Sequence, residues 1–594
     1  MLQRFFIFLF VLNSLSSAAQ HTAEQAESYY EKGAFNKALI IYESLAKQYP
    51  NSYNYRIKLI DIHQQLEQYD KSETIIRSIL ERRYNPMIEI MLGYNFQLQD
   101  RKDRANAHYE NAIAFTDEHP NYIYSIARKF EEYALLERAI QVYEKAKVLT
   151  PQKDYSIQLA KIYGDLGNVE QMFSNYITYI AYAPSHINSI KRAISDFISE
   201  NSENENNRYL RRQLLIRIQQ EPSTYWYEML SWLYIQEKAY QKAFIQEKAL
   251  YKRQPESLYR IIELANLAHT DHDDATAKTI YNFILDVTQN LGAVLSAHQA
   301  LLEIDTKTAD PQQLEVIDEN YKGLFKTYGK NERTLDLQLA YGKFLAFHKK
   351  DPNAATTFLK QSLTLNLTKF EEAEIKLLLA DILVLQEKFN EALIFYSQIQ
   401  LNLKNSPIAQ EARFKVAKTS YYKGDFDWAE SQLKVLKSST SQLIANDALD
   451  LKLLISDNKY EDSTQTALKS YAKADLLAFQ NKPKAAISLL DQLLKAHQGE
   501  SITDQALFKQ AQLFEQTKQF DKAEANYLQL IKDYRDGILA DDAHYHLAEL
   551  YRNALDQPEK AKDYYEIILF KYQDSIYFVE ARRRFRMLRG DFIN

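Results

Sequence analysis

AESYYEKGAFNKALIIYESLAKQYP, residues 26–50, returns as AKIYGDLGNVEQMFSNYITYIAYAP, residues 160–184, with its small, aromatic, glycine and proline residues at identical spacings. In both halves of the pattern apolar residues recur at intervals of three and four, which is the period of an amphipathic helix. The glycine between the halves marks a turn, and the closing proline cannot continue the helical hydrogen bonds. Each copy therefore predicts two amphipathic helices joined by a short turn.

The same spacing recurs along most of the chain, with further copies that begin at Ala127, Ser231, Ala380, Ala417, Ala474 and Ala511. An alanine recurs where two helices must approach closely, because a larger side chain would overpack the contact at a cost of about 1–3 kcal/mol. These alanines are Ala38, Ala139, Ala243, Ala392, Ala429 and Ala523. A single helix pair cannot bury its apolar faces, so the repetition predicts stacked hairpins.

This order of small, aromatic, glycine, alanine, aromatic and proline residues resembles the tetratricopeptide repeat family. The resemblance implies an all-α fold, an α-solenoid superhelix of roughly 12–14 helical hairpins. Residues 504–581 also resemble the repeats of bacterial envelope proteins, such as the outer-membrane assembly lipoproteins and the cell-division coordinators. Those lipoproteins carry a lipidated N-terminal cysteine, and this chain has no cysteine, so anchoring of that kind is excluded.

The N-terminus has the pattern of a secretory signal peptide over residues 1–19. Arg4 is followed by the apolar run Phe5 to Leu12, and Ser17 to Ala19 fits the small-residue cleavage rule. The apolar run is short for a membrane span, and no later segment approaches 18 apolar residues. We therefore expect a periplasmic chain without a transmembrane span after cleavage; a retained N-terminal anchor is the alternative.

Polar stretches at residues 199–207, 306–312 and 456–466 predict exposed loops, and residues 445–455 are a candidate extra helix. The pairing of helices at 187–223 and 292–372 is left open by the sequence. Soft boundaries near 205, 300 and 460 then divide the chain. The expected segments are an N-terminal repeat array (20–205), a second repeat segment (206–300), a degenerate and then regular segment (301–460), and a C-terminal array with a basic capping helix (461–594).

The composition argues against catalysis and against nucleic-acid binding. With only 12 glycines and no cysteine, phosphate-binding loops and thiol chemistry are disfavoured. The net charge of −6 lacks the strongly basic character of nucleic-acid-binding proteins. The densest ligand-like cluster, His269 to Asp274, is better interpreted as a turn at His272 followed by an aspartate that caps the next helix. We expect no catalytic residue, no bound metal and no cofactor.

The family resemblance implies that partner proteins contact the first helix of each hairpin. Carried over to this chain, the contact positions are Tyr94, Tyr124, Arg128 and Lys161, of which the last two occupy the same place in adjacent repeats. The alternative is that these side chains are simply solvated. The arginine-rich stretch 582–589 either caps the open end of the solenoid or contacts an acidic partner or anionic lipid.

These observations predict a non-catalytic periplasmic scaffold or adaptor that docks partner proteins, or exported polypeptides, in a groove of repeats. The envelope-biogenesis setting comes from the resemblance. A membrane-associated assembly component, held by a retained N-terminal helix or by the arginine-rich end, is one alternative, and an enzyme built on a solenoid is another.

Overall fold

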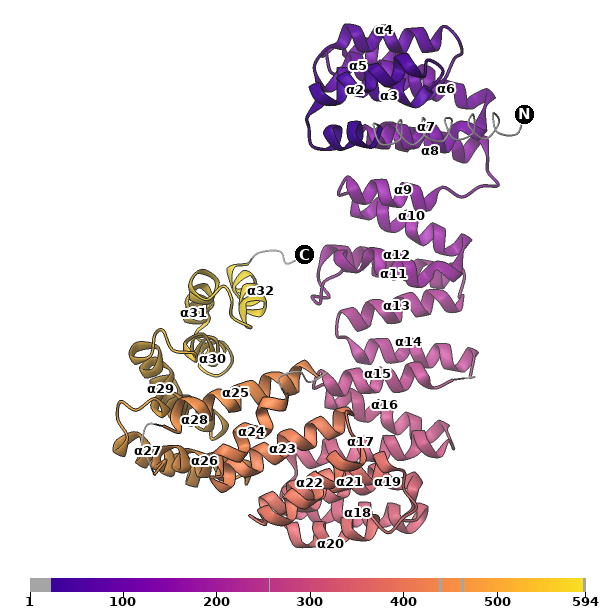
Figure 1. Cartoon of the computed structure of the whole chain (residues 1–594). Coiled ribbons are helices and arrows are strands. Elements are labelled where there is room, and N and C mark those ends of the chain that lie inside the picture. The colour runs from indigo at the N-terminus through magenta and orange to yellow at the C-terminus, as the bar shows by residue number, and fades with distance from the viewer. Residues whose placement is uncertain (1–22, 256, 437–440, 461–463, 591–594) are drawn as a thin grey trace, which may run out of the picture. The chain divides into compact units, whose positions relative to one another are not determined.

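The computed structural model describes residues 23–255, 257–436, 441–460 and 464–590. Throughout these ranges the regular structure is helical, without a strand. Successive helices form antiparallel hairpins that stack on one another (Figure 1). The predicted all-α solenoid of tetratricopeptide type is confirmed, while the predicted signal peptide lies outside the described residues.

The chain divides into two compact units, the first ending at Gln254 and the second beginning at Pro255. The boundaries expected near residues 205, 300 and 460 stay predictions. After a helix over residues 23–31, the helices of the first unit are α2 (Phe35–Gln48), α3 (Tyr53–Gln65), α4 (Tyr69–Leu80), α5 (Pro86–Gln97), α6 (Lys102–Glu118), α7 (Ile123–Glu132), α8 (Leu136–Leu149), α9 (Ser156–Asp165), α10 (Val169–Tyr182), α11 (Ile187–Ile194), α12 (Glu205–Gln220), α13 (Thr224–Gln236) and α14 (Tyr240–Arg253).

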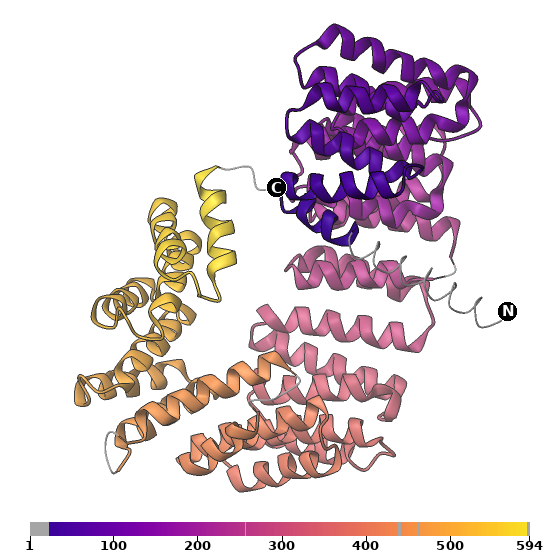
Figure 2. The same ribbon diagram turned by 45° about the horizontal axis from the view of Figure 1, so that its top comes forward.

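The second unit is also built of helical hairpins, and α32 packs on α31 at its C-terminal end (Figure 2). Its helices are α15 (Tyr259–Thr270), α16 (Asp274–Val287), α17 (Leu291–Thr308), α18 (Pro311–Tyr328), α19 (Leu335–Lys343) with its π-helical extension η5 (Phe344–His348), α20 (Pro352–Ser362), α21 (Lys369–Leu385), α22 (Phe389–Asn402), α23 (Pro407–Lys423), α24 (Phe426–Leu436), α25 (Gln442–Asn458), α26 (Thr466–Phe479), α27 (Pro483–Ala496), α28 (Ile502–Gln516), α29 (Phe520–Asp533), α30 (Ala540–Asn553), α31 (Pro558–Lys571) and α32 (Phe578–Arg589).

Alanines hold the hairpins together where the sequence predicts close approach. All six of the predicted positions, from Ala38 to Ala523, are completely buried. First helices contact the first helices of neighbouring hairpins, as α5 contacts α7 and α19 contacts α21, and second helices do the same, as α6 contacts α8. Each unit is thus built of an inner and an outer row of helices.

The turn inside most hairpins is made by one residue in the left-handed region. Gly33 and Gly167, at φ of 70° and 71°, adopt this conformation without the strain that a Cβ atom brings. In the hairpin before that of Gly167, Ala134 takes the same place at φ 53°. The hairpin therefore fixes the left-handed conformation of this residue, and glycine only lowers the steric cost of adopting it.

Tyrosines of the second helices do more than fill space, which is all that the sequence predicts for them. Their hydroxyl groups donate to a polar side chain on the first helix of the same hairpin. The pairs are Tyr42 with Glu27, Tyr109 with Gln97, Tyr143 with Glu131, Tyr281 with Asn266, Tyr396 with Asp381, Tyr527 with Glu515 and Tyr565 with Glu549. The phenol thus buries its ring and keeps its hydroxyl bonded at the inner row.

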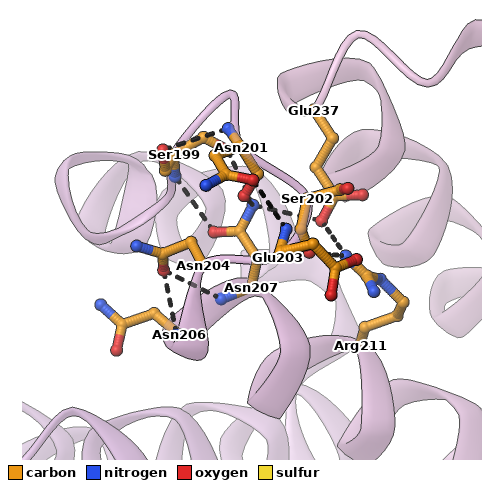
Figure 3. Close-up of polar contacts among 9 residues, drawn as sticks. All are labelled: Ser199, Asn201, Ser202, Glu203, Asn204, Asn206, Asn207, Arg211 and Glu237. Atoms are coloured by element: carbon orange, nitrogen blue, oxygen red, sulfur yellow. Dashed lines mark hydrogen bonds and ion pairs between the residues drawn. The ribbon is translucent and has the colours of Figure 1, made fainter. Parts of the chain in front are cut away.

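The polar stretch at residues 199–207 is an ordered loop rather than a plain solvent-exposed one (Figure 3). Asn207 is fully buried, donates to the carbonyl of Ser199 at 2.7 Å and accepts from its backbone N–H at 3.0 Å. Arg211 donates to the carbonyl of Ser202 and to Glu237 of α13, both at 2.6 Å. The expectation of an exposed loop is wrong for Asn207, because the polar groups of this stretch bond to one another and to α13.

The structure also tests the loop predicted at residues 306–312 and the extra helix predicted at residues 445–455. Residues 306–312 do not form a loop. Thr306 lies in the last turn of α17, and Asp310 caps the N-terminus of α18, so the two helices are joined by a short connection. The extra helix expected at 445–455 is confirmed as part of α25, which packs on α24. The polar pattern of 306–312 was misleading because helix ends and caps use the same residue types as loops.

Candidate partner-binding groove

One position on the first helix of a hairpin recurs along the inner row of helices, and we call it the groove position. It lies six residues before the left-handed turn residue. In the first unit the groove positions of successive hairpins are Glu27, Asp61, Tyr94, Arg128 and Lys161. Contacts between hairpins occur at this row, as described below, so these side chains share one face.

Tyr94 belongs to a cluster that joins three first helices. Its ring stacks on Tyr133, with 4.1 Å between centroids and 9° between planes. The Tyr133 hydroxyl lies 3.5 Å from Asp61 of α3, and the Lys129 ammonium lies 4.8 Å from the centre of the Tyr133 ring. Tyr94 is therefore a half-buried wall of the groove rather than a free contact residue.

Asp61 is the chemically unusual member of this cluster. Burial raises its pKa to about 6, and the positive charges of Lys129 and Lys58 offset only part of this effect. Both lysines are already engaged, Lys58 with Glu27 at 2.5 Å and Lys129 with Glu132 at 2.9 Å. The groove thus holds a carboxyl group that forms no ion pair with any of the described residues and is suited to accept a hydrogen bond or a positive charge.

Arg128 and Lys161 occupy the same register in adjacent hairpins. Both positive charges act on the same carboxylate, Glu131, whose pKa is nevertheless raised by burial. The Arg128 side chain is 81% exposed and reaches Glu132 only at 3.8 Å. Lys161 is exposed as well. Carboxylates lie close to the pair, since Arg128 reaches Glu132, and Asp165 acts on Glu131 together with both cations. Arg128 and Lys161 are therefore exposed cations in a region of mixed charge.

Tyr124 lies one turn before Arg128 on α7 and is 43% exposed. Its ring contacts Tyr155 and Tyr143, with centroids 5.3 Å and 6.1 Å away. Neighbouring aromatic rings hold Tyr124 in place, so it offers a fixed and partly exposed aromatic surface.

The sequence prediction missed Asp61, Lys58, Lys129 and Tyr133. A signal for Asp61 was present, because it occupies the same register as the three predicted residues Tyr94, Arg128 and Lys161. The register of the second hairpin is hidden by Ile60 and His63, which replace the usual alanine and aromatic residue. Lys129 and Tyr133 lie off the register, and only the approach of α3, α5 and α7 brings them to Asp61.

The inner row of the second unit contains a cavity of about 660 Å³. It is lined by the first helices α15, α17, α19, α21 and α23 and by Tyr281 of the second helix α16. Asn266 and Asp381, at groove positions, belong to its wall. Leu339, Leu377 and Leu378 give it an apolar side. This volume falls within the range of ~300–1,000 Å³ that is typical of ligand sites.

Further along the same row, Asp475 forms a closed ionic centre. It lies at the groove position of α26, is buried, and contacts Lys418 at 2.6 Å and Lys509 at 2.8 Å. Burial alone would raise the pKa of Asp475, but the two lysines lower it well below the usual range. The centre ties α23, α26 and α28 together, and both oxygens of its carboxylate are already engaged by lysines.

The suspected ligand cluster after α15 is a helix connection. His272 takes the left-handed turn at φ 64°, Asp273 caps α16 by accepting from the N–H of Thr276 at 3.1 Å, and His269 bonds to Asp274 at 2.8 Å. This confirms the interpretation as a turn and a cap. Across the described ranges, no group of three or more metal-ligating side chains is arranged to hold a metal ion.

The arginine-rich helix α32 is partly tied to its neighbours. Arg584 contacts Glu580 at 2.7 Å and Glu549 of α30 at 3.9 Å, and Arg583 donates to Glu580. Gly590 ends the helix in the left-handed conformation. These contacts favour a capping role. None of the described helices is both long and apolar enough for a membrane crossing.

Comparison with known proteins supports the repeat assignment. The family model described as "Tetratricopeptide repeat" matches residues 24–52, 505–537 and 542–575, which are the first hairpin and the hairpins α28–α29 and α30–α31. The chain therefore contains tetratricopeptide repeats, a fold of protein–protein interaction scaffolds. No curated protein matches the chain.

Solved structures that resemble the chain include the Naa15/Naa10 complex bound to HypK-THB, with 12% identity, a TM-score of 0.27 and coverage of 96% of this chain and 94% of that chain. Yeast Tom70 has 12% identity, a TM-score of 0.27 and coverage of 96% and 99%. The Cut9–Hcn1 hetero-tetramer of the APC/C has 12% identity, a TM-score of 0.20 and coverage of 97% and 98%.

Proposed function

We propose that this protein is a non-catalytic adaptor that docks partner proteins or exported polypeptides along the groove of its first unit. The observation that carries the proposal is the cluster at Asp61, where side chains from three successive first helices meet. Its tyrosine wall offers rigid contact area with polar tips. On α7 and α9 the exposed side chains of Arg128 and Lys161 offer cationic contacts, so an extended segment that crosses the hairpins would meet both kinds of contact.

The proposed place of action is the periplasm, within envelope biogenesis or secretion. This part of the proposal is supported by the signal-peptide pattern at residues 1–19 and by the resemblance of residues 504–581 to envelope repeat proteins. It rests on sequence and analogy. Determination of the mature N-terminus tests it, because a start at Gln20 is the expected product and a retained Met1 contradicts secretion with cleavage.

The docking proposal is tested by affinity capture of envelope proteins on the full chain. The variant Arg128→Glu/Lys161→Glu reverses the exposed positive charges beside the Asp61 cluster. The matched control, Arg82→Glu/Arg83→Glu, makes the same charge change in the exposed connection between α4 and α5. We expect the groove variant to lose captured proteins that the control retains.

Equal capture by the two variants, with unchanged circular dichroism, would eliminate this face of the first unit as the docking site. Capture of no envelope protein by the unmodified chain would contradict the adaptor function itself.

A further inference from the structure

The cavity of the second unit has a charge pattern that the groove of the first unit lacks. Five carboxylates line it, Glu303, Asp336, Glu374, Asp381 and Glu411, against a single lysine, Lys343, and a single histidine, His269. The histidine is bonded to Asp274. The lining is therefore strongly negative, and its negative charges come from four different helices.

Some of these carboxylates are already bonded within the protein. Asp381 contacts Lys415 at 2.9 Å and accepts from the Tyr396 hydroxyl, and Glu303 accepts from the Gln299 amide at 2.9 Å. In contrast, Asp336, Glu374 and Glu411 form no ion pair with any described residue. Three acidic side chains of the lining therefore have no ion-pair partner among the described residues, and Lys343 is the one lysine that shares the lining with them.

Crowding of these charges is visible at Glu374. Burial raises its pKa, and the negative charges of Asp336 and Glu371 raise it further. A cation placed between Asp336 and Glu374 would relieve this repulsion and be attracted to both groups at a site partly withdrawn from water.

The apolar side of the cavity narrows the class of ligand. Leu339 and Leu377 come from the same two helices as Asp336 and Glu374, so apolar and acidic surfaces lie next to one another. A small hydrated cation would leave the leucines without a contact. A peptide segment that carries both basic and apolar side chains matches both surfaces.

We propose that this cavity is a docking site for a basic, partly apolar segment of a partner polypeptide, with Asp336 and Glu374 as the principal charge contacts and the leucines as the apolar contact. The inference rests on the proposed adaptor function and names the chemistry of one of its partners. It assigns the second unit a specificity for cationic segments that is separate from docking in the first unit.

The test measures fluorescence anisotropy of a labelled peptide of about 12 residues that alternates leucine and arginine, titrated with the full chain. A matched peptide has glutamate in place of arginine, and spermidine supplies positive charge without apolar side chains. We expect the basic peptide to bind at least about tenfold more tightly than either of the other probes. Its affinity should fall when sodium chloride is raised from about 50 mM to about 300 mM.

The variant Asp336→Asn/Glu374→Gln should weaken binding of the basic peptide about tenfold. Its control, Glu391→Gln/Glu566→Gln, removes the same charge from exposed positions of α22 and α31 and should bind like the unmodified chain. Circular dichroism confirms that both variants fold.

Equal affinity of the two variants would overturn the site, and equal affinity for spermidine would overturn a polypeptide as the ligand. These failures are distinguishable from failure of the adaptor function. If the unmodified chain still captures envelope proteins but does not bind the basic peptide, only the present inference is wrong.

Discussion

Asp61 in the first unit and Asp475 in the second occupy the same groove position, yet they are in opposite electrostatic states. Asp475 contacts two lysines within 3 Å, and its pKa is lowered well below the usual range. At Asp61 burial dominates and raises the pKa to about 6, because the two nearest lysines are bonded to other carboxylates. The repeat places the carboxyl group, and the neighbouring hairpins decide its charge.

This difference separates structural from functional use of one position. A carboxylate closed off by two lysines stabilises the stack of hairpins but offers nothing to a partner. A carboxyl group without a close cation costs stability and can be satisfied by a ligand. We therefore expect the two aspartates to respond in opposite ways to the same substitution.

The largest effect is expected for Asp475→Asn. This change leaves Lys418 and Lys509 facing each other beside a buried neutral amide, so the free energy of unfolding should fall by about 3–5 kcal/mol. Urea denaturation, together with hydrogen exchange of α26, measures it. The more exposed Asp381→Asn, with one lysine partner, is the matched control and should lose clearly less. Equal losses would contradict the closed ionic centre.

A smaller effect is expected when a tyrosine hydroxyl is removed. Tyr396→Phe deletes a close hydrogen bond to Asp381 from a buried ring and should cost about 1.5–3 kcal/mol. Tyr133→Phe deletes only the 3.5 Å contact with Asp61 and should cost less than about 0.5 kcal/mol. Denaturation of both variants measures the difference, and a larger loss for Tyr133→Phe would place Asp61 in the same bonded class as Asp381.

The third prediction concerns pH. Because the pKa of Asp61 is raised from 3.8 to about 6, the folded state binds its proton more tightly than the unfolded chain does. Its contribution to stability is therefore greatest at low pH and is lost as the pH rises through about 6. Asp61→Asn should raise the free energy of unfolding by about 1 kcal/mol near pH 7.5 and by less near pH 5. A variant that is less stable than the unmodified chain near pH 7.5 would mean that Asp61 is paired in solution.

The smallest effect on stability is expected for Arg128→Glu/Lys161→Glu. Both side chains are exposed, so the free energy of unfolding should change by less than about 0.5 kcal/mol. The same variant should lose captured partners, as proposed above. A thermal melt beside the capture experiment separates the two effects, and a large loss of stability would show that these charges hold the hairpins rather than a ligand.

Much of the fold could be read from the sequence because it is local. The spacing of Ala38, Tyr42 and Pro50 fixes one hairpin, and stacking follows from the apolar faces that such a hairpin cannot bury alone. The family resemblance also pointed to Tyr94, Arg128 and Lys161 as contact positions, and these stay predictions. The sequence did not predict the ordered loop at Asn207, because the same polar residue types occur in loops that bond to water and in loops that bond internally.

The sequence by itself determined most of the hairpins and their order, since these depend on helical periodicity and on the size of single side chains. The groove positions were implied by the family resemblance. Only the tertiary structure decided which groove residues bond to neighbouring hairpins and which are available to bind a ligand. That depends on lysines and tyrosines from other hairpins, such as Lys509 at Asp475 and Tyr133 at Asp61, whose distance in space is set by helix packing and not by their distance along the chain.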